Sequence, residues 1–144
     1  MYALDKISGK EVWKAEAGGF ASTWGTPLLI ESNQRTDIVL GVPAEIWGFN
    51  PENGKLRWYC EAVPGRSFCS SLVFDNQLIY AMGDDSSGAA AIKPGGDEDV
   101  TKSHVAWNSR DRSRIASPVV VDGRLYAVNN KVATCLDTVI GFAT

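Results

Sequence analysis

The sequence has few of the residues that mark specialised protein classes. It contains three cysteines and one histidine among 144 residues. Three cysteines are too few for the disulfide framework of a small secreted domain, and no cysteine or histidine cluster has the spacing of a zinc site. Apolar runs such as Val119–Val121 are far shorter than the about 20 residues that a membrane-spanning helix needs. After Met1 the chain reaches Asp5 and Lys6 without an apolar segment, so we expect neither a membrane span nor an export signal in it.

An excess of positive charge is also missing. Fourteen basic side chains against seventeen acidic ones give a net charge of −3 and argue against a nucleic-acid partner. Hydrophobic residues make up 44% and charged residues 22%, which excludes a disordered chain. The length is that of one domain. We therefore expect a folded domain that does not bind nucleic acid.

One motif recurs along the chain. Residues 2–13 and 47–58 both contain an aromatic residue, an apolar residue two places later, Asp or Asn, a short turn, Gly-Lys and a tryptophan. A looser copy spans residues 91–107, where residues 95–99 lengthen the turn, and a fourth copy begins at Cys135. The matched apolar positions are separated by 45, 43 and 44 residues: Leu4, Phe49, Ile92 and Leu136. Such a steady spacing predicts a repeat architecture.

A second element repeats in phase with the first. Residues 26–30, 70–74 and 117–121 are short apolar runs, and each precedes a polar turn and another apolar stretch. Asp122-Gly123 between two such runs is typical of a hairpin turn. No segment shows extended helical periodicity. The sequence thus predicts an all-β fold in which each unit has four short strands, with the innermost strand buried on both faces.

Four antiparallel strands every 40–50 residues are typical of the blade of a β-propeller. The prediction is one partial propeller segment over residues 1–144. Its units are a half blade, two blades and a partial blade, at residues 2–16, 25–60, 69–109 and 116–138. Gly9 and Gly54 are expected to supply left-handed backbone in the turn between the third and fourth strands. The tryptophans of the outermost strands are expected to fill the wedge between neighbouring blades: Trp13, Trp58 and Trp107.

The pattern A-L-D-x-x-x-G-K-x-x-W, with Ser/Thr-Pro and aliphatic residues a few tens of positions before it, resembles the pyrroloquinoline-quinone-like propeller repeat over about residues 2–142. Members of this superfamily include quinoprotein alcohol dehydrogenases, an outer-membrane assembly lipoprotein of Gram-negative bacteria and propellers attached to bacterial kinases. The resemblance implies a quinoprotein-like propeller fold and a periplasmic or cell-envelope location in a bacterium. Because the superfamily holds both enzymes and scaffolds, the resemblance indicates the fold more than the function.

The repeats amount to about three blades, whereas a closed propeller ring has four to eight. An open arc would expose strand edges and blade faces. We therefore expect that the chain is a fragment of a longer protein or that copies of it self-associate to complete the propeller. In the second case, the N-terminal half blade of one copy would complement the C-terminal partial blade of another.

The residues argue against an enzyme. Quinoprotein dehydrogenases of the resembled family have two adjacent cysteines and a calcium ion held by Glu, Asn and Asp, whereas Cys60, Cys69 and Cys135 are well separated here. We expect neither pyrroloquinoline quinone nor calcium in this chain. The cysteines are predicted to be small buried hydrophobic residues, although a pairing of Cys60 with Cys69 stays open. A fragment of a pyrroloquinoline-quinone-dependent oxidoreductase is the alternative interpretation.

Other candidates for chemistry are weak. His104 is the one possible histidine base and is expected in a solvated loop. The acidic segments Asp84–Asp85 and Asp97–Asp99 could attract calcium, but they are expected to solvate their loops. The sequence therefore predicts no catalytic, cofactor-binding or metal-binding residue.

Aromatic residues and arginines gather in the connections between blades. The connections contain Phe20 and Trp24, then Pro64, Arg66 and Phe68, then Arg110, Arg112 and Arg114. In a propeller these connections share one face with the turns near Glu45, Asp84 and Asn129. A mixture of aromatic and arginine side chains suits a protein-contact surface. The predicted face consists of Trp24, Arg66, Phe68, Arg110, Arg112 and Arg114. We thus expect a non-catalytic protein-binding or assembly scaffold with a protein or peptide partner, and a ligand-reading or carbohydrate-reading propeller is a third interpretation.

Overall fold

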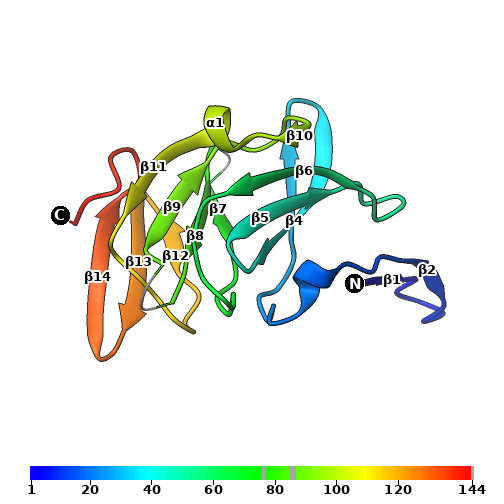
Figure 1. Ribbon diagram of the computed structural model, residues 1–144, viewed down its shortest axis with the longest axis horizontal. Coiled ribbons are helices and arrows are strands. Elements are labelled where there is room, and N and C mark those ends of the chain that lie inside the picture. The colour runs from blue at the N-terminus through cyan, green and yellow to red at the C-terminus, as the bar shows by residue number, and fades with distance from the viewer. Residues whose placement is uncertain (76, 85–86, 144) are drawn as a thin grey trace.

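The computed structural model describes residues 1–75, 77–84 and 87–143. Asn76 of one predicted turn and Asp85 of one predicted acidic segment lie outside the described residues. Strands form nearly all of the regular structure, which agrees with the predicted all-β class. They build four small sheets that follow one another in chain order, from the N-terminus to the C-terminus (Figure 1).

Apart from β10 (Glu98–Asp99), which joins a sheet formed earlier in the chain, each sheet is formed by strands that follow one another and pair antiparallel. Sheet 1 contains β1 (Tyr2–Leu4) and β2 (Glu11–Lys14). Sheet 2 contains β3 (Leu28–Ser32), β4 (Arg35–Val42), β5 (Glu45–Phe49) and β6 (Leu56–Glu61). Sheet 3 contains β7 (Val73–Phe74), β8 (Ile79–Met82), β9 (Ala89–Ile92) and β11 (Val105–Ser109). Sheet 4 contains β12 (Val119–Val121), β13 (Arg124–Asn129) and β14 (Val132–Asp137).

The lengthened turn in the third repeat has a structure of its own. It contains β10 (Glu98–Asp99) and the short helix α1 (Thr101–His104), and a 3-10 helix, η1 (Gly18–Phe20), precedes sheet 2. β10 adds to the outer edge of β6 as a parallel strand, with Glu98 opposite Trp58. The turn of sheet 3 therefore reaches across to sheet 2 and covers its outer edge (Figure 1).

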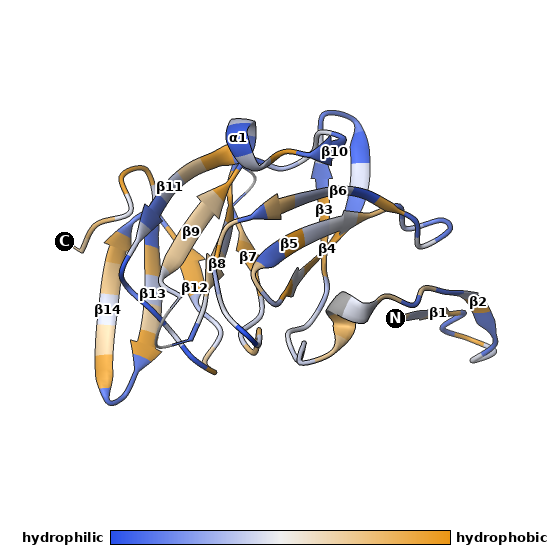
Figure 2. Cartoon of the chain, in the orientation of Figure 1, coloured by the Kyte–Doolittle hydropathy of each residue, from blue (hydrophilic) through white to orange (hydrophobic). Residues whose placement is uncertain are grey.

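Apolar side chains fill the spaces between neighbouring sheets. One buried cluster joins sheets 2 and 3 and includes Val39, Ile46, Ile79 and Ile92. A second joins sheets 3 and 4 and includes Leu136. Figure 2 shows that the middle strands β8 and β9 are largely hydrophobic, and every residue of both strands is buried.

The predicted burial of the innermost strands on both faces is wrong. β7 is only half-buried, and β12 buries none of its residues completely. In the three sheets with more than two strands, the first strand lies at one edge, so it has a partner strand on only one side. The middle strands have a partner on each side and neighbouring sheets across their faces, and they form the core instead.

Two of the three repeat tryptophans join their own sheet to the next one. Trp13 donates its indole N–H to the carbonyl of Pro51 at 2.8 Å, and Trp107 makes the same bond to Thr138 at 2.8 Å. A glycine lies under each ring. A Cβ at Gly54 would be 2.6 Å from the Trp13 ring, and one at Gly141 would be 2.5 Å from the Trp107 ring. These glycines are therefore required for the rings to approach the turns.

Trp58 has different surroundings, although the sequence predicts the same role for all three rings. Its ring is fully buried in the cluster between sheets 2 and 3, but it lies over Gly48 of its own sheet. Its N–H donates to the carboxylate of Asp37 at 2.9 Å. The corresponding turn of sheet 3 is the lengthened one, so it does not offer the short turn that binds Trp13 and Trp107.

Two alanine substitutions distinguish the energetic cost of a clash with the indole from the cost of backbone strain. Gly9 and Gly54 share a φ of +69°, but no described atom lies within 4 Å of a Cβ at Gly9. Both Gly→Ala changes place a side chain in left-handed backbone, which costs about 1 kcal/mol. Gly54→Ala also forces a methyl group into the Trp13 ring, and we expect it to cost about 1–3 kcal/mol more than Gly9→Ala. Urea unfolding of both variants measures the difference, and equal losses would contradict this packing.

Candidate contact face

Three connections link the outer strand of one sheet to the first strand of the next: residues 15–27, 62–72 and 110–118. A chain of hydroxyl contacts holds them side by side. The backbone N–H of Thr26 donates to the Ser71 hydroxyl at 3.0 Å, and that of Ser71 donates to the Ser117 hydroxyl at 2.9 Å. These residues open the repeated apolar runs, so the repeat itself produces the ladder.

The connections also pack against turns between the second and third strands of the sheets. The N–H of Ala62 donates to the carbonyl of Ala44 at 3.3 Å. The N–H of Ser113 donates to Gly83 at 3.2 Å, and its hydroxyl donates to the carbonyl of Val128 at 3.0 Å. Connections and turns thus meet at one end of the sheets, and we call this surface the contact face. It carries Trp24, Glu45, Glu61, Arg66, Asp84, Arg110, Arg112, Arg114 and Asn129.

Five of the six residues predicted for partner contact have exposed side chains. Trp24 is 66% exposed. The other four are all arginines: Arg66, Arg110, Arg112 and Arg114. Tryptophan and arginine are both enriched at protein interfaces. The structure thus presents these side chains to solvent on three neighbouring connections.

Phe68 is not available for contact, and its assignment to the face is wrong. Its side chain is only 1% exposed and belongs to the core between sheets 2 and 3. The ring fills the space over Gly41, where a Cβ would be 2.3 Å from it. Its backbone pairs with the first connection, since its N–H donates to Ser22 and its carbonyl accepts from Trp24. Phe68 therefore supports the position of Trp24 rather than meeting a partner.

Phe20 likewise faces inward. Its ring lies 5.8 Å from that of Trp47 and 5.9 Å from that of Phe49, so η1 covers one face of sheet 2. Together with Leu40 and Val42 these rings form a third apolar cluster. The aromatic part of the contact face is thus Trp24.

Charge is distributed unevenly over the contact face. Glu45 and Glu61 are directly opposite each other in the β5–β6 pairing, and both line an open pocket of about 310 Å³ with Ala44, Ala62 and Pro64. The negative charge of Asp99 is the main cause that raises the pKa of Tyr59. Partial burial and the negative charges of Glu45, Glu61 and Glu98 raise it further. The end of sheet 2 at the contact face is therefore acidic. The third connection, in contrast, carries three arginines within residues 110–114.

The candidates for chemistry do not converge on a site. His104 was expected in a solvated loop, but it ends α1 and is half-buried, and burial followed by Lys93 lowers its pKa. Asp84 accepts a hydrogen bond from Ser87 at 2.6 Å, and Asp97 pairs with Arg35. Among the described residues, no group of three or more His, Cys, Asp or Glu lies close enough together to hold a metal ion.

Cys60 and Cys69 are free thiols, so the pairing that the sequence left open is not formed in the structure. Burial is the main cause that raises the pKa of Cys60 to about 11. At pH 8 only about 0.1% of such a thiol is ionised, and the thiolate is the reactive form. We expect Cys60 to resist iodoacetamide at pH 8 until urea unfolds the chain. Mass spectrometry of the alkylated peptides checks this, and rapid labelling in the folded protein would contradict the burial.

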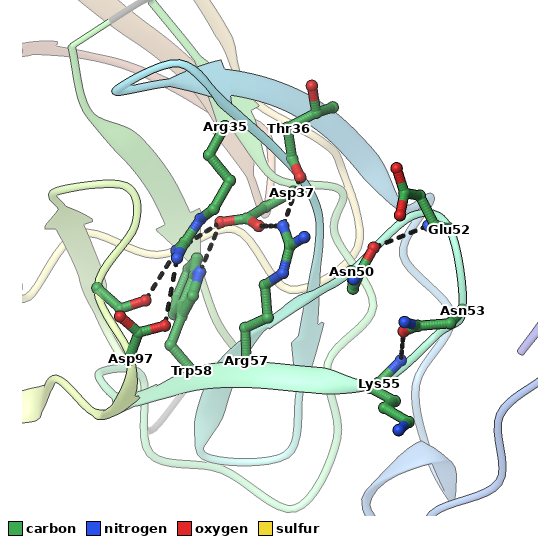
Figure 3. Close-up of polar contacts among 11 residues, drawn as sticks. Arg35, Thr36, Asp37, Asn50, Glu52, Asn53, Lys55, Arg57, Trp58 and Asp97 are labelled. Atoms are coloured by element: carbon green, nitrogen blue, oxygen red, sulfur yellow. Dashed lines mark hydrogen bonds and ion pairs between the residues drawn. The ribbon is translucent and has the colours of Figure 1, made fainter.

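The sequence analysis missed a charged network at the opposite end of the sheets (Figure 3). Asp37 on β4 is 3% exposed and accepts hydrogen bonds from Arg57 at 2.5 Å, Trp58 at 2.9 Å and Arg35 at 3.1 Å. Arg35 also donates to the carbonyl of Gly96 at 2.7 Å, so it binds the lengthened turn of sheet 3 to sheet 2. Arg35 lies two residues before Asp37 on β4, whereas Arg57 and Trp58 come from β6, so their convergence on Asp37 appears only in three dimensions.

A family model described as outer membrane protein assembly factor BamB, a PQQ-repeat family, matches residues 1–141. The chain belongs to this family. No curated protein sequence matches the chain. The crystal structure of BamB from Moraxella catarrhalis matches the fold with a TM-score of 0.63 and 18% sequence identity. That match covers 99% of this chain and 44% of the other.

The BamB-like PQQ repeat therefore describes nearly the whole chain, and its sheets correspond to part of a β-propeller. This confirms the resemblance and the fold class that the repeated motif predicts. The chain spans less than half the length of the BamB structure that it matches. Neither helix of the described chain has the length or hydrophobicity that crossing a bilayer requires.

Proposed function

We propose that the chain is a non-catalytic scaffold that binds a protein or peptide partner through the contact face. The single observation that carries the proposal is the exposure of Trp24 beside arginine-bearing connections on a rigid set of sheets. Tryptophan and arginine are the residues that most often dominate binding energy at protein interfaces. A scaffold of this kind would need no catalytic group.

The arrangement of the face supports this role. Hydrogen bonds from backbone N–H groups hold the connections to each other, through serine hydroxyls, and to the adjacent turns, so their side chains project from fixed positions. A pre-organised surface loses less conformational entropy when it binds. The separate acidic and basic regions would orient a partner of complementary charge.

The family gives the proposal a cellular context. BamB is named as an assembly factor for outer membrane proteins, and we propose a role in assembly within a bacterial cell envelope for this chain. The chain corresponds to 44% of the length of the BamB structure. The role is therefore proposed for the contact face of this segment, and not for the whole of a relative's activity.

Photo-crosslinking tests the proposed face. The crosslinking amino acid p-benzoylphenylalanine is placed at position 24, 66 or 110, and at Glu52 and Asn53 in the exposed turn at the other end of sheet 2 as matched controls. The variants are produced in the periplasm of a Gram-negative host. We expect a discrete crosslinked polypeptide from positions 24, 66 and 110 and at least a ten-fold weaker signal from the controls.

Charge reversal provides the specificity control. The combined substitution Arg110→Glu, Arg112→Glu and Arg114→Glu should remove the crosslink from position 24, because it inverts the basic part of the face. Circular dichroism checks that the variant stays folded. Equal crosslinking from both ends of the sheets, or crosslinks that survive charge reversal, would refute the proposal.

A further inference from the structure

The turn between β5 and β6 contains the one Asn-Gly dipeptide of the sequence, Asn53-Gly54. Asparagine is among the thermolabile residues of proteins. Its side-chain carbonyl can be attacked by the backbone nitrogen of the next residue, and a glycine at that position has no Cβ to obstruct the approach. The turn lies at the end of sheet 2 away from the contact face, so its chemistry is separate from the proposed function.

The native turn holds both reacting groups in hydrogen bonds. The Gly54 N–H donates to the carbonyl of Asn50 at 2.8 Å. The side-chain Oδ1 of Asn53 accepts the backbone N–H of Lys55 at 3.0 Å (Figure 3). Asn53 is exposed, but Gly54 is buried, and a Cβ there would be 2.6 Å from the Trp13 ring. The Gly54 nitrogen must lose its proton to solvent before it attacks, so these contacts have to break first.

We propose that Asn53 is a deamidation site and that the native turn prevents the reaction until the turn opens. The co-reactant is water. In the opened turn, hydroxide removes the amide proton of Gly54, and the nitrogen forms a bond to Cγ of Asn53. The bond between Cγ and the side-chain nitrogen breaks, and that nitrogen leaves as ammonia with protons from water. The product is a succinimide ring that joins residues 53 and 54.

Hydrolysis of the ring gives two products. Water that breaks the new bond between Cγ and the Gly54 nitrogen leaves aspartate at residue 53. Water that breaks the original peptide bond leaves isoaspartate, whose chain continues through Cγ with an additional methylene. Overall one water is consumed and one ammonia is released, and nothing is oxidised or reduced. The longer isoaspartyl backbone changes the spacing between Asn50 and Gly54, so we expect it to weaken the contact of this turn with Trp13.

Peptide mapping by mass spectrometry tests the site. The protein is incubated in mildly alkaline buffer, either folded or unfolded in urea, and the mass of each asparagine-containing peptide is followed against a sample digested without incubation. If the turn must open first, the rate in the folded protein is the rate in urea multiplied by the open fraction. We expect deamidation of Asn53 to be at least about ten-fold slower in the folded protein. Methylation by protein isoaspartate methyltransferase identifies the isoaspartyl product.

Asn50 in the same turn is the internal control. It precedes Pro51, whose backbone nitrogen has no hydrogen, so no succinimide forms at Asn50 in either state. Asn53→Gln is the variant control, because the longer side chain would need a six-membered ring, and we expect this variant to lose the mass change at residue 53 in both states.

Two tryptophan variants test whether the native turn controls the rate. Trp13→Ala removes the ring that covers Gly54, and we expect deamidation of the folded protein to become at least about three-fold faster. Trp24→Ala removes an exposed ring on the contact face and should leave the rate unchanged. Circular dichroism checks that both variants stay folded. Equal rates in folded and unfolded protein, no reaction of Asn53 in urea, or a rate in Trp13→Ala no higher than in Trp24→Ala would overturn the proposal.

Discussion

Asp37→Ala is expected to lower the free energy of unfolding by about 3–5 kcal/mol. The carboxylate is almost completely buried and accepts hydrogen bonds from Arg35, Arg57 and the indole of Trp58 (Figure 3). Alanine would leave two guanidinium groups and one buried N–H without their acceptor. Urea unfolding followed by circular dichroism measures the loss.

Asp97→Ala is the matched control for Asp37→Ala. Asp97 pairs with the same Arg35 at 3.2 Å, but its side chain is 80% exposed. An exposed pair contributes at most about 1 kcal/mol, and less at high salt. If both alanine variants lowered the free energy of unfolding equally, burial would not explain why the Asp37 network stabilises the fold.

The second large effect is expected for Trp58→Ala. The ring is fully buried between sheets 2 and 3, and its removal leaves a cavity and the Asp37 carboxylate without one donor. Truncation of a buried aromatic residue of this size costs about 3–5 kcal/mol. Urea unfolding of the purified variant checks the value.

Trp24→Ala is the matched comparison for Trp58→Ala. The Trp24 side chain is mostly exposed on the contact face, and we expect its loss to change stability by less than about 0.5 kcal/mol. A loss similar to that of Trp58→Ala would show that Trp24 supports the fold, and it would remove the main reason for assigning it to a partner.

The repeat was predictable because its signals are local. The Asp or Asn, the glycine and the tryptophan are separated by only a few residues, and each has its effect within one turn or strand. Gly9 and Gly54 do adopt the expected left-handed backbone. The family match and the BamB structure confirm the architecture that this spacing predicts.

Other features depend on contacts between distant residues. The side chain of Phe68 points inward because Gly41, 27 residues earlier, leaves a space for it. β10 pairs with β6 across about 40 residues of chain, so the lengthened turn of sheet 3 lies along the outer edge of sheet 2. No local pattern encodes these contacts, so inspection of the residues could not find them.

The hydroxyl ladder of the connections affects how the molecule unfolds. Ser71 takes part in two successive links, since its hydroxyl accepts from Thr26 and its own N–H donates to Ser117. In a chain of repeats each unit contacts only its neighbours, so cooperativity depends on the junctions. Loss of one unit would release the link on either side of it, and melting should spread along the array from the weakest junction instead of staying confined to a single repeat.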